Sequence, residues 1–187
     1  MAENNIINMD DIEKVLLSED DIKEIIARLG KQITEDYKGK NLLVVSVLKG
    51  SIMFMADLLR EIKVHCKIDF MAVSSYGSSS TTSGSVKIIK DLNIDLKDYD
   101  LLIVEDILDS GVTLSNLKKM LMLRSPASFK ICTFLDKPER RIADIKADYV
   151  GAVIPDNFVV GYGLDFDEKY RNLPYVGALS PSVYADK

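Results

Sequence analysis

The side chains best suited to chemistry in this sequence lie together between residues 105 and 113. An apolar run at residues 101–104 ends in two acids, and a third acid and a small-residue turn follow: Glu105, Asp106, Asp109, Ser110, Gly111, Val112 and Thr113. Backbone N–H groups of such a turn, and the N-terminus of a helix that follows it, can bind a phosphate. Paired carboxylates can accept hydrogen bonds from ribose hydroxyls or hold Mg²⁺ through water. The spacing therefore predicts a sugar-phosphate site at the carboxyl end of a buried strand, where ligands bind in open α/β sheets.

Taken alone, each of these acids is explained about equally well by an ordinary turn and by a binding site. Aspartate and serine favour turns and helix N-caps because their side chains hydrogen-bond to nearby backbone N–H groups. Three acids and two hydroxyls around one glycine are more than a turn needs. The complete group therefore favours a binding site.

The elements that would position this group alternate between strand and helix. Ser18 and the acids after it predict a helix N-cap, and apolar residues then recur at helical spacing from Ile22 to Ile33. Residues 42–48 form a continuous apolar run typical of a strand buried on both faces. Further strands are expected at residues 66–72, 86–92, 100–105, 129–135 and 149–154, helices near 54–62 and 114–123, and an irregular tail from Asp156 onward. The alternation predicts an α/β fold with a mostly parallel twisted sheet and helices on its faces.

Composition excludes several classes of protein. The 187 residues, 47% hydrophobic and 28% charged, suit a single globular domain spanning 1–187. A net charge of −5 gives no support for a nucleic-acid-binding surface, and no apolar run approaches the ~20 residues of a transmembrane helix. The acidic N-terminus lacks the features of a signal peptide, and Cys66 and Cys132 have the apolar surroundings of buried core thiols. We expect a cytoplasmic protein without nucleic-acid or membrane partners.

Residues 74–85 are almost entirely serine, threonine and glycine around Tyr76. No core can be built from them, so the segment is either an inert loop or a functional lid. Long structureless loops inside a compact domain are more often functional, which favours a lid.

The sequence VEDILDSGVT, residues 104–113, resembles the phosphoribosyl-pyrophosphate-binding motif of the type I phosphoribosyltransferases, and its third acid, Asp109, matches the form found in the 6-oxopurine enzymes. The resemblance extends from about Val44 to Ser180 through four separate motifs. It implies the fold of that family, an α/β sheet flanked by helices with a small hood formed by terminal segments. It also implies a homodimer or homotetramer.

The activity that the resemblance implies is Mg²⁺-dependent transfer of a phosphoribosyl group from 5-phosphoribosyl 1-pyrophosphate to N9 of hypoxanthine or guanine. The products would be IMP or GMP and pyrophosphate, as in purine salvage. By the same resemblance, Glu105 and Asp106 orient the ribose, residues 110–113 bind the phosphate, and Asp109 is the catalytic residue at the purine N7. Asp165 joins Glu105 and Asp106 in holding Mg²⁺, and Ser75 and Tyr76 belong to the lid.

Leu48, Lys49 and Gly50 follow a predicted strand and precede a predicted helix. A lysine and a glycine at such a position can bind an anion, although a plain β–α turn is at least as good an explanation. In the family the matching loop binds pyrophosphate, and its Leu–Lys peptide is often cis. The resemblance also assigns Arg171 to the pyrophosphate, a task that suits the guanidinium group.

Lys137 ends a predicted strand, and Phe158 lies between polar and glycine-rich segments. From the sequence alone, the first reads as a solvated lysine and the second as an aromatic residue that pins a surface loop. The resemblance makes Lys137 the donor to the purine O6, Phe158 the ring that stacks on the base and Val159 a backbone contact at its edge. An ammonium has only donors, so it suits a carbonyl oxygen better than an exocyclic amine.

Two other functions remain open at this point. A regulatory protein of the same fold could bind the same sugar phosphate and act on nucleic acid, but it would need a basic face. A phosphoribosyltransferase for another base, xanthine or adenine, is the second. Lys137, Phe158 and Asp109 together argue against adenine, and they do not separate hypoxanthine, guanine and xanthine.

Overall fold

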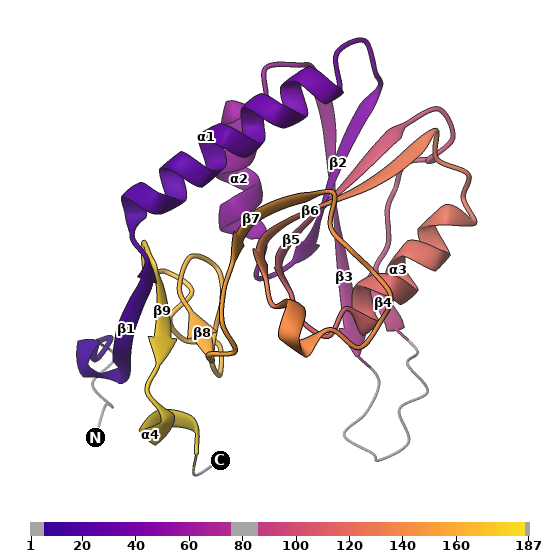
Figure 1. Ribbon diagram of the computed structural model, residues 1–187. Coiled ribbons are helices and arrows are strands. Elements are labelled where there is room, and N and C mark those ends of the chain that lie inside the picture. The colour runs from indigo at the N-terminus through magenta and orange to yellow at the C-terminus, as the bar shows by residue number, and fades with distance from the viewer. Residues whose placement is uncertain (1–5, 76–85, 186–187) are drawn as a thin grey trace.

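The computed structural model describes residues 6–75 and 86–185 and contains two sheets (Figure 1). In these residues the larger sheet has six strands in the order β4-β3-β2-β5-β6-β7, and every neighbouring pair is parallel except β3 and β4. Their bounds are β2 (Leu42–Leu48), β3 (Cys66–Ser75), β4 (Val86–Lys90), β5 (Asp100–Leu108), β6 (Ser128–Asp136) and β7 (Tyr149–Val153). This is the mostly parallel α/β sheet that the alternation of elements predicts.

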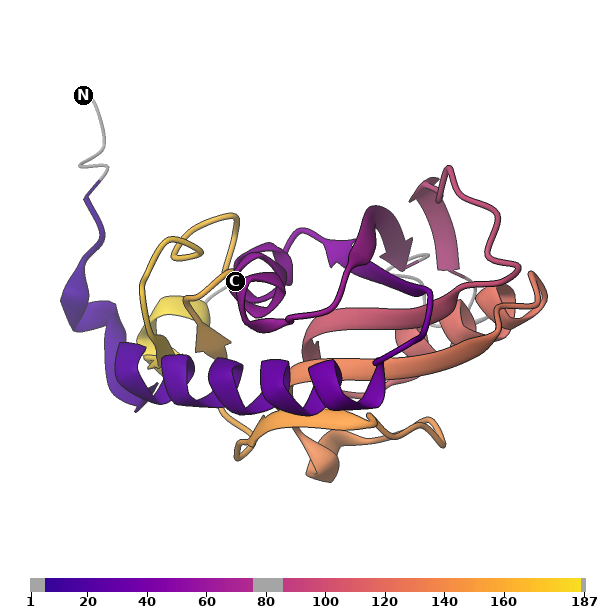
Figure 2. The ribbon, with the colours of Figure 1, turned by 90° about the horizontal axis from the view of Figure 1, so that it is seen from above.

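Helices cover both faces of this sheet, with α1 (Glu19–Asp36) and α2 (Ile52–Glu61) on one face and α3 (Val112–Met122) on the other (Figures 1 and 2). Alternate residues of β2 show the division. Leu42 and Val44 belong to the core cluster under α1 and α2, whereas Leu43 and Val45 belong to the cluster under α3. Because both faces of β2 are buried, its sequence is continuously apolar.

The start of α1 confirms the N-cap expected at Ser18. The Ser18 hydroxyl accepts from the Asp21 N–H at 3.2 Å, and the Asp21 carboxylate accepts from the Ser18 N–H at 2.8 Å. This reciprocal capping box satisfies two N–H groups that a helix end otherwise leaves unpaired. Ile22, Ile26 and Ile33 then lie on the buried face of the helix.

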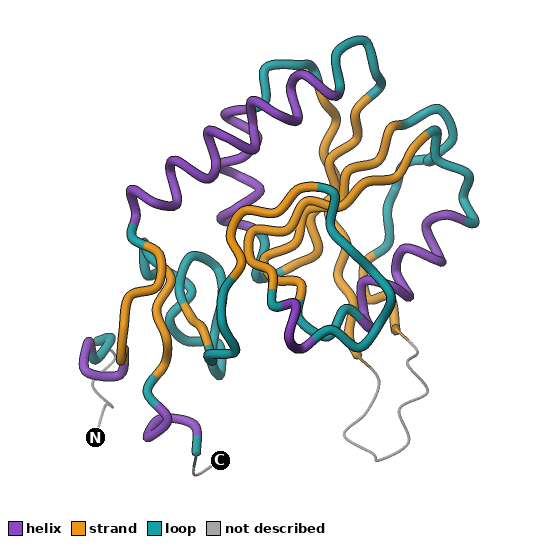
Figure 3. The backbone as a smooth tube through the Cα atoms, in the orientation of Figure 1, coloured by secondary structure: helices purple, strands orange, loops and turns teal. Residues whose placement is uncertain are grey.

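A smaller antiparallel sheet, in the order β1-β9-β8, forms a hood beside the carboxyl edge of the main sheet. It consists of β1 (Ile12–Leu17), β8 (Val159–Val160) and β9 (Val176–Leu179), flanked by the 3₁₀ helix η1 (Met9–Asp11) and by α4 (Pro181–Tyr184). The hood expected from terminal segments is confirmed. The tail from Asp156 is less irregular than expected, because β8 and β9 are short strands separated by a long loop (Figure 3).

Strand β5 is longer than its apolar run and continues to Leu108. The strand therefore ends three residues after the expected end at residue 105, and both Glu105 and Asp106 lie within it. A second 3₁₀ helix, η2 (Pro138–Arg140), follows β6. Within residues 6–75 and 86–185, no helix combines the length and apolarity that crossing a membrane requires.

Candidate active site

The carboxyl ends of β2, β5 and β6 lie at one edge of the sheet, because these strands are parallel and paired in register. The segment after β5 and the one after β2 meet there around a cavity of about 320 Å³, here called the acidic cavity. Among the predicted residues, its lining includes Leu48, Lys49, Gly50, Glu105, Asp106, Asp109, Ser110, Gly111, Thr113, Asp165 and Arg171. Residues expected to bind phosphoribosyl, pyrophosphate and Mg²⁺ therefore come together.

Val112 and the lid residues are the exceptions. Val112 is the first residue of α3 and is not among the described lining of the cavity. Ser75 ends β3, while Tyr76 and the rest of the predicted lid lie outside the described residues.

The turn after β5 has a backbone that requires glycine. Gly111 has φ +76°, and a Cβ atom there would lie 2.6 Å from Cγ2 of Ile145 and 3.1 Å from Cδ of Arg141. The turn leads directly into α3, and Gly111 has no side chain to cap it. Because Gly111 and Thr113 line the acidic cavity, the N-terminus of α3 lies at its wall as a site for an anion.

Arg141, which no sequence motif marks, holds this turn in place through its guanidinium group. Its Nε donates to the carbonyl of Asp109 at 3.0 Å and its Nη2 to that of Leu108 at 3.1 Å, and it forms an ion pair with Asp136. One guanidinium thus links the end of β5 to the end of β6. A pair of arginines soon after Lys137 is the only trace of this role in the sequence.

Burial changes the proton affinity of the two acids at the end of β5. Burial raises the pKa of Glu105 well above its ordinary value, and the neighbouring charge of Asp106 raises it further. Burial also raises the pKa of Asp106 to about 6, although the Ile107 N–H donates to this carboxylate at 2.7 Å. A buried carboxylate and a half-buried one, both with raised pKa values, attract a cation, because a positive charge would favour their ionised forms.

Mg²⁺ fits this set of oxygen donors only as an ion that is shared with a substrate. Within residues 6–75 and 86–185, no three His, Cys, Asp or Glu side chains are arranged to hold a metal alone. Magnesium commonly takes one or two carboxylates, several waters and substrate phosphates. Glu105, Asp106 and Asp165 line one cavity and suit that mode of binding.

The segment after β2 packs tightly against both the acids and the hood. The Leu48–Lys49 peptide is cis, as in the family that the sequence resembles. A Cβ atom on Gly50 would lie 1.5 Å from Oδ2 of Asp106, and one on Gly163 would lie 2.0 Å from the carbonyl oxygen of Gly50. The two glycines therefore allow three segments to meet at the acidic cavity.

Arg171 enters the acidic cavity from the hood. Its Nη2 lies 2.8 Å from Oδ1 of Asp165, and its Nη1 donates to the carbonyl of Gly163 at 2.8 Å. Its Nε is buried and makes no hydrogen bond within the described part of the chain. Lys49 forms a more exposed ion pair with Glu168 at 3.0 Å. Both cations predicted to bind pyrophosphate thus lie beside the cavity, each paired with an acid.

A second cavity of about 390 Å³, here called the aromatic cavity, adjoins the first. The two share Ile107, Asp109 and Asp165. The lining of the aromatic cavity includes the three residues predicted to bind a purine, Lys137, Phe158 and Val159. Asp109 therefore lies where a sugar phosphate in one cavity would meet a base in the other.

The aromatic cavity combines a buried cation with a half-exposed ring. Lys137 is only 6% exposed and donates to the carbonyl of Asn157. Burial lowers the pKa of Lys137, while the charge of Asp109 acts in the opposite direction. Phe158 is 41% exposed and stacks on Tyr184, with ring centroids 5.1 Å apart and planes at 26°.

Tyr184 and Arg140 also line this cavity, and the sequence analysis does not single out either. Tyr184 comes from α4, and Arg140 ends η2. Their positions depend on how distant segments meet, so no local pattern marks them.

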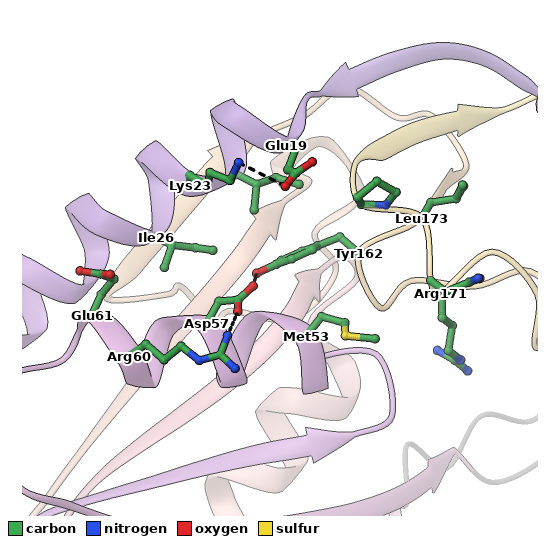
Figure 4. Close-up of a pocket in the computed structure, with 13 residues that line it drawn as sticks. Glu19, Lys23, Ile26, Met53, Asp57, Arg60, Glu61, Tyr162, Arg171 and Leu173 are labelled. Carbon is green, nitrogen blue, oxygen red and sulfur yellow. Dashed lines mark hydrogen bonds and ion pairs between the residues drawn. The ribbon is translucent and has the colours of Figure 1, made fainter.

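A larger cavity, of about 480 Å³, lies between α1, α2 and residues 171–174 (Figure 4). Within its lining, Asp57 accepts from the Tyr162 hydroxyl at 2.8 Å and from Arg60 at 2.7 Å. Only Arg171 is common to this cavity and the acidic one, and Figure 4 shows its guanidinium pointing away from Tyr162 and Asp57. The predicted chemical groups therefore gather in the acidic and aromatic cavities.

Comparisons with known proteins agree with this geometry. The family model for the phosphoribosyl transferase domain matches residues 14–167. The hypoxanthine-guanine phosphoribosyltransferase of Staphylococcus aureus (strain Mu50) is 54% identical over 176 residues, which cover 94% of this chain and 98% of that protein. A crystal structure of a hypoxanthine phosphoribosyltransferase from Staphylococcus aureus superposes with a TM-score of 0.93 at 53% identity, covering 97% of this chain and 99% of that one.

A third relative is longer. The bifunctional protein TilS/HprT of Listeria innocua is 54% identical over 176 residues, covering 94% of this chain, and the chain spans only 27% of its length. The match to the family model covers the strands and turns that form both cavities up to Asp165, and the solved structure has the same fold throughout. This chain therefore belongs to the phosphoribosyltransferase family.

Proposed function

We propose that this chain is a hypoxanthine-guanine phosphoribosyltransferase of purine salvage. A relative of that name is 54% identical over 94% of the chain. The observation that carries the proposal is the junction of the two cavities at Asp109, because a transferase must bring a sugar phosphate and a base together at one point.

The reaction exchanges one bond at the anomeric carbon of the ribose. The bond from C1′ to the pyrophosphate oxygen breaks, the bond from C1′ to purine N9 forms, and the base loses one proton. In this proposal Asp109 takes or shares that proton through purine N7, which makes N9 a better nucleophile. The N-terminus of α3 and the turn at residues 110–113 hold the 5′-phosphate.

The leaving pyrophosphate needs positive charge around it. Arg171 and Lys49 lie beside the acidic cavity and supply two cations, which exchange their acidic partners for phosphate oxygens when the substrate binds. Mg²⁺ bound through Glu105, Asp106 and Asp165 would neutralise developing charge on the pyrophosphate. Glu105 and Asp106 also accept from the ribose hydroxyls.

The aromatic cavity selects the base. A purine in this cavity, beside Ile107 and the ring of Phe158, would present its O6 to Lys137 and its edge to the backbone of Val159. Stacking tolerates any purine, so the discrimination falls to Lys137. The geometry supports 6-oxopurines in preference to adenine.

The wider setting is also part of the proposal. We place the enzyme in the cytoplasm, where its two unpaired thiols, Cys66 and Cys132, would stay reduced. A homodimer or homotetramer would cover exposed apolar side chains on α2, β3 and β4: Met53, Ile68 and Ile89.

Purified protein supplied with 5-phosphoribosyl 1-pyrophosphate, Mg²⁺ and each of hypoxanthine, guanine, xanthine and adenine tests the function. We expect IMP and GMP to form with one pyrophosphate each, and a chelator of divalent cations to stop the reaction. Failure to form either nucleotide under these conditions would refute the proposal.

A further inference from the structure

Four charged side chains alternate in sign along the wall of the aromatic cavity. Nε of Arg140 lies 2.9 Å from Oδ1 of Asp109, and Nη1 of Arg140 lies 3.3 Å from Oδ1 of Asp156. Oδ1 of Asp156 lies 3.8 Å from Nζ of Lys137. We call this series Asp109–Arg140–Asp156–Lys137 the charge chain.

The ends of the charge chain are the two groups proposed to meet the purine. Asp109 follows β5 and Lys137 follows β6, so both project from the same edge of the sheet. The two middle members come from elsewhere: Arg140 ends η2, and Asp156 lies in the segment between β7 and β8. Backbone hydrogen bonds already join these segments, since the Lys137 N–H donates to the Leu108 carbonyl and the Ile154 N–H to the Asp136 carbonyl, each at 3.0 Å. The charge chain adds a link between the side chains, whose positions the backbone does not fix.

We propose that Arg140 and Asp156 are positioning residues that set the distance and direction between the Asp109 carboxylate and the Lys137 ammonium. The inference rests on the proposed function, because it concerns how one site meets N7 and O6 of the same base. Neither middle residue needs to touch the purine. Both act through the residues that do.

At the Asp109 end of the charge chain, the two oxygens of the carboxylate differ in their surroundings. Arg140 approaches Oδ1 of Asp109 as an ion pair, while Oδ1 makes no aligned hydrogen bond within the described part of the chain. The carboxylate is therefore oriented by charge, and its other oxygen stays available to accept from the base. Arg141 holds the backbone of the same residue through its carbonyl oxygen.

At the other end, Lys137 has two restraints. Its ammonium donates to the carbonyl of Asn157 and lies near the Asp156 carboxylate, while the rest of the side chain is buried. The Asp156 carboxylate also binds Arg140, so movement of one cation alters the restraint on the other. This coupling distinguishes the charge chain from two separate surface ion pairs.

A purely structural role predicts a different result. Exposed ion pairs of this kind contribute little to folding stability, and the Arg140 side chain is about half exposed. Misplacing a reacting group by a fraction of the hydrogen-bond distance, by contrast, lowers the rate of reaction strongly. Breaking the charge chain should therefore lower kcat/KM for the purine while leaving thermal stability almost unchanged.

The test uses Arg140→Gln, Asp156→Asn and the double variant, each compared with the unaltered enzyme. We expect kcat/KM for hypoxanthine to fall by about tenfold to a hundredfold in each single variant. The KM for 5-phosphoribosyl 1-pyrophosphate should stay within about twofold, because neither Arg140 nor Asp156 lines the acidic cavity. The double variant should lose little more than either single one, since each already breaks the chain.

Arg140→Lys should recover part of the lost kcat/KM for hypoxanthine, because lysine keeps the positive charge. The recovery should be incomplete, because lysine lacks the guanidinium fork that reaches two carboxylates. Arg124→Gln is the matched control: Arg124 pairs with Asp91, neither residue is in the lining of the acidic or the aromatic cavity, and its loss should leave the kinetics unchanged. Unchanged hypoxanthine kinetics in Arg140→Gln, or fully additive losses in the double variant, would overturn the inference while leaving the proposed function intact. An unaltered protein that forms no IMP would overturn both.

Discussion

Asp109 is the residue on which the proposed chemistry depends most. It borders both cavities, and its backbone and side chain are held by two different arginines. A turn residue would need neither arrangement. Its position therefore favours a chemical role over the structural one that the sequence alone left open.

We expect Asp109→Asn to lower turnover with hypoxanthine by roughly a hundredfold or less, because the amide cannot accept the proton that leaves the base. Binding of 5-phosphoribosyl 1-pyrophosphate should largely survive, since the phosphate turn is unaltered. Steady-state kinetics with each substrate varied separates the two effects. Wild-type turnover in this variant would make Asp109 a structural turn residue.

Lys137 is the residue proposed to distinguish 6-oxopurines from adenine. Adenine would place an amine opposite the buried ammonium, and an unpaired buried polar group costs about 1–3 kcal/mol. At about 1.4 kcal/mol per decade, this predicts roughly tenfold to a few-hundredfold discrimination. We expect Lys137→Gln to reduce the preference for 6-oxopurines over adenine, because an amide offers either a donor or an acceptor.

The measurement is kcat/KM for hypoxanthine, guanine and adenine in both proteins. An unchanged preference in the Lys137→Gln variant would move base selection to Asp109 and the backbone at Val159. The charge chain adds a check, since Arg140→Gln should weaken the same preference.

At the scale of elements, the site depends on close contacts between three segments. Gly50 follows β2, Asp106 belongs to β5, and Gly163 lies between β8 and β9. Each glycine removes a Cβ atom that would collide with its neighbour. The acids, the pyrophosphate segment and the hood therefore form one unit.

Gly50→Ala tests this unit. The new Cβ atom would displace the Asp106 carboxylate, so we expect the KM for 5-phosphoribosyl 1-pyrophosphate to rise by about tenfold or more. Gly39→Ala is the control, because Gly39 has φ +74° but no atom within 4 Å of the added Cβ. That variant should lose about 1–2 kcal/mol of stability, because its backbone is left-handed, and should keep its KM. A Gly50→Ala enzyme with unaltered KM would contradict the contact.

The bounds of the helices and strands show which parts of the fold the sequence could predict. Local patterns predicted α1 with its cap and β2 between its observed bounds, since both depend on neighbouring residues. They stopped β5 at residue 105, because two adjacent acids, Glu105 and Asp106, interrupt the apolar run before Ile107 and Leu108. Strands β8 and β9 were missed because they are short and each pairs with a strand distant in sequence.

The difference between local patterns and distant contacts also explains which site residues the sequence predicted. The motif at residues 105–113 could be recognised because its members are neighbours in the sequence. Arg140, Arg141 and Tyr184 escaped notice because their importance comes from what they touch, and those partners lie on other segments. The roles assigned to the predicted residues stay predictions until the variants are measured.

At the scale of the whole molecule, the acidic cavity opposes stability. The folded protein holds Asp106 with a pKa of about 6, above the ~3.9 of an unfolded chain. Between these values the folded state binds more protons than the unfolded state, so this carboxyl lowers stability as pH rises. The penalty is absent below pH ~4 and complete above pH ~6.

We therefore expect Asp106→Asn to raise the stability of the ligand-free protein at pH 7 by about 1–2 kcal/mol, less than the full shift because the group is only partly buried. The gain should shrink as pH falls from about 6 to 4. Chemical denaturation across this range measures the gain, and Glu13→Gln, at an exposed position, controls for the loss of one negative charge. A loss of stability at pH 7 would show that the carboxylate supports the fold.

The most direct test of the whole account is the specificity of the unaltered enzyme. Values of kcat/KM for hypoxanthine, guanine and adenine, with 5-phosphoribosyl 1-pyrophosphate and Mg²⁺ at saturation, compare the bases under one set of conditions. The account predicts that both 6-oxopurines exceed adenine by at least about tenfold, with IMP and GMP as products. Adenine used as efficiently as hypoxanthine would contradict the assignment of Lys137 and of the aromatic cavity to 6-oxopurines.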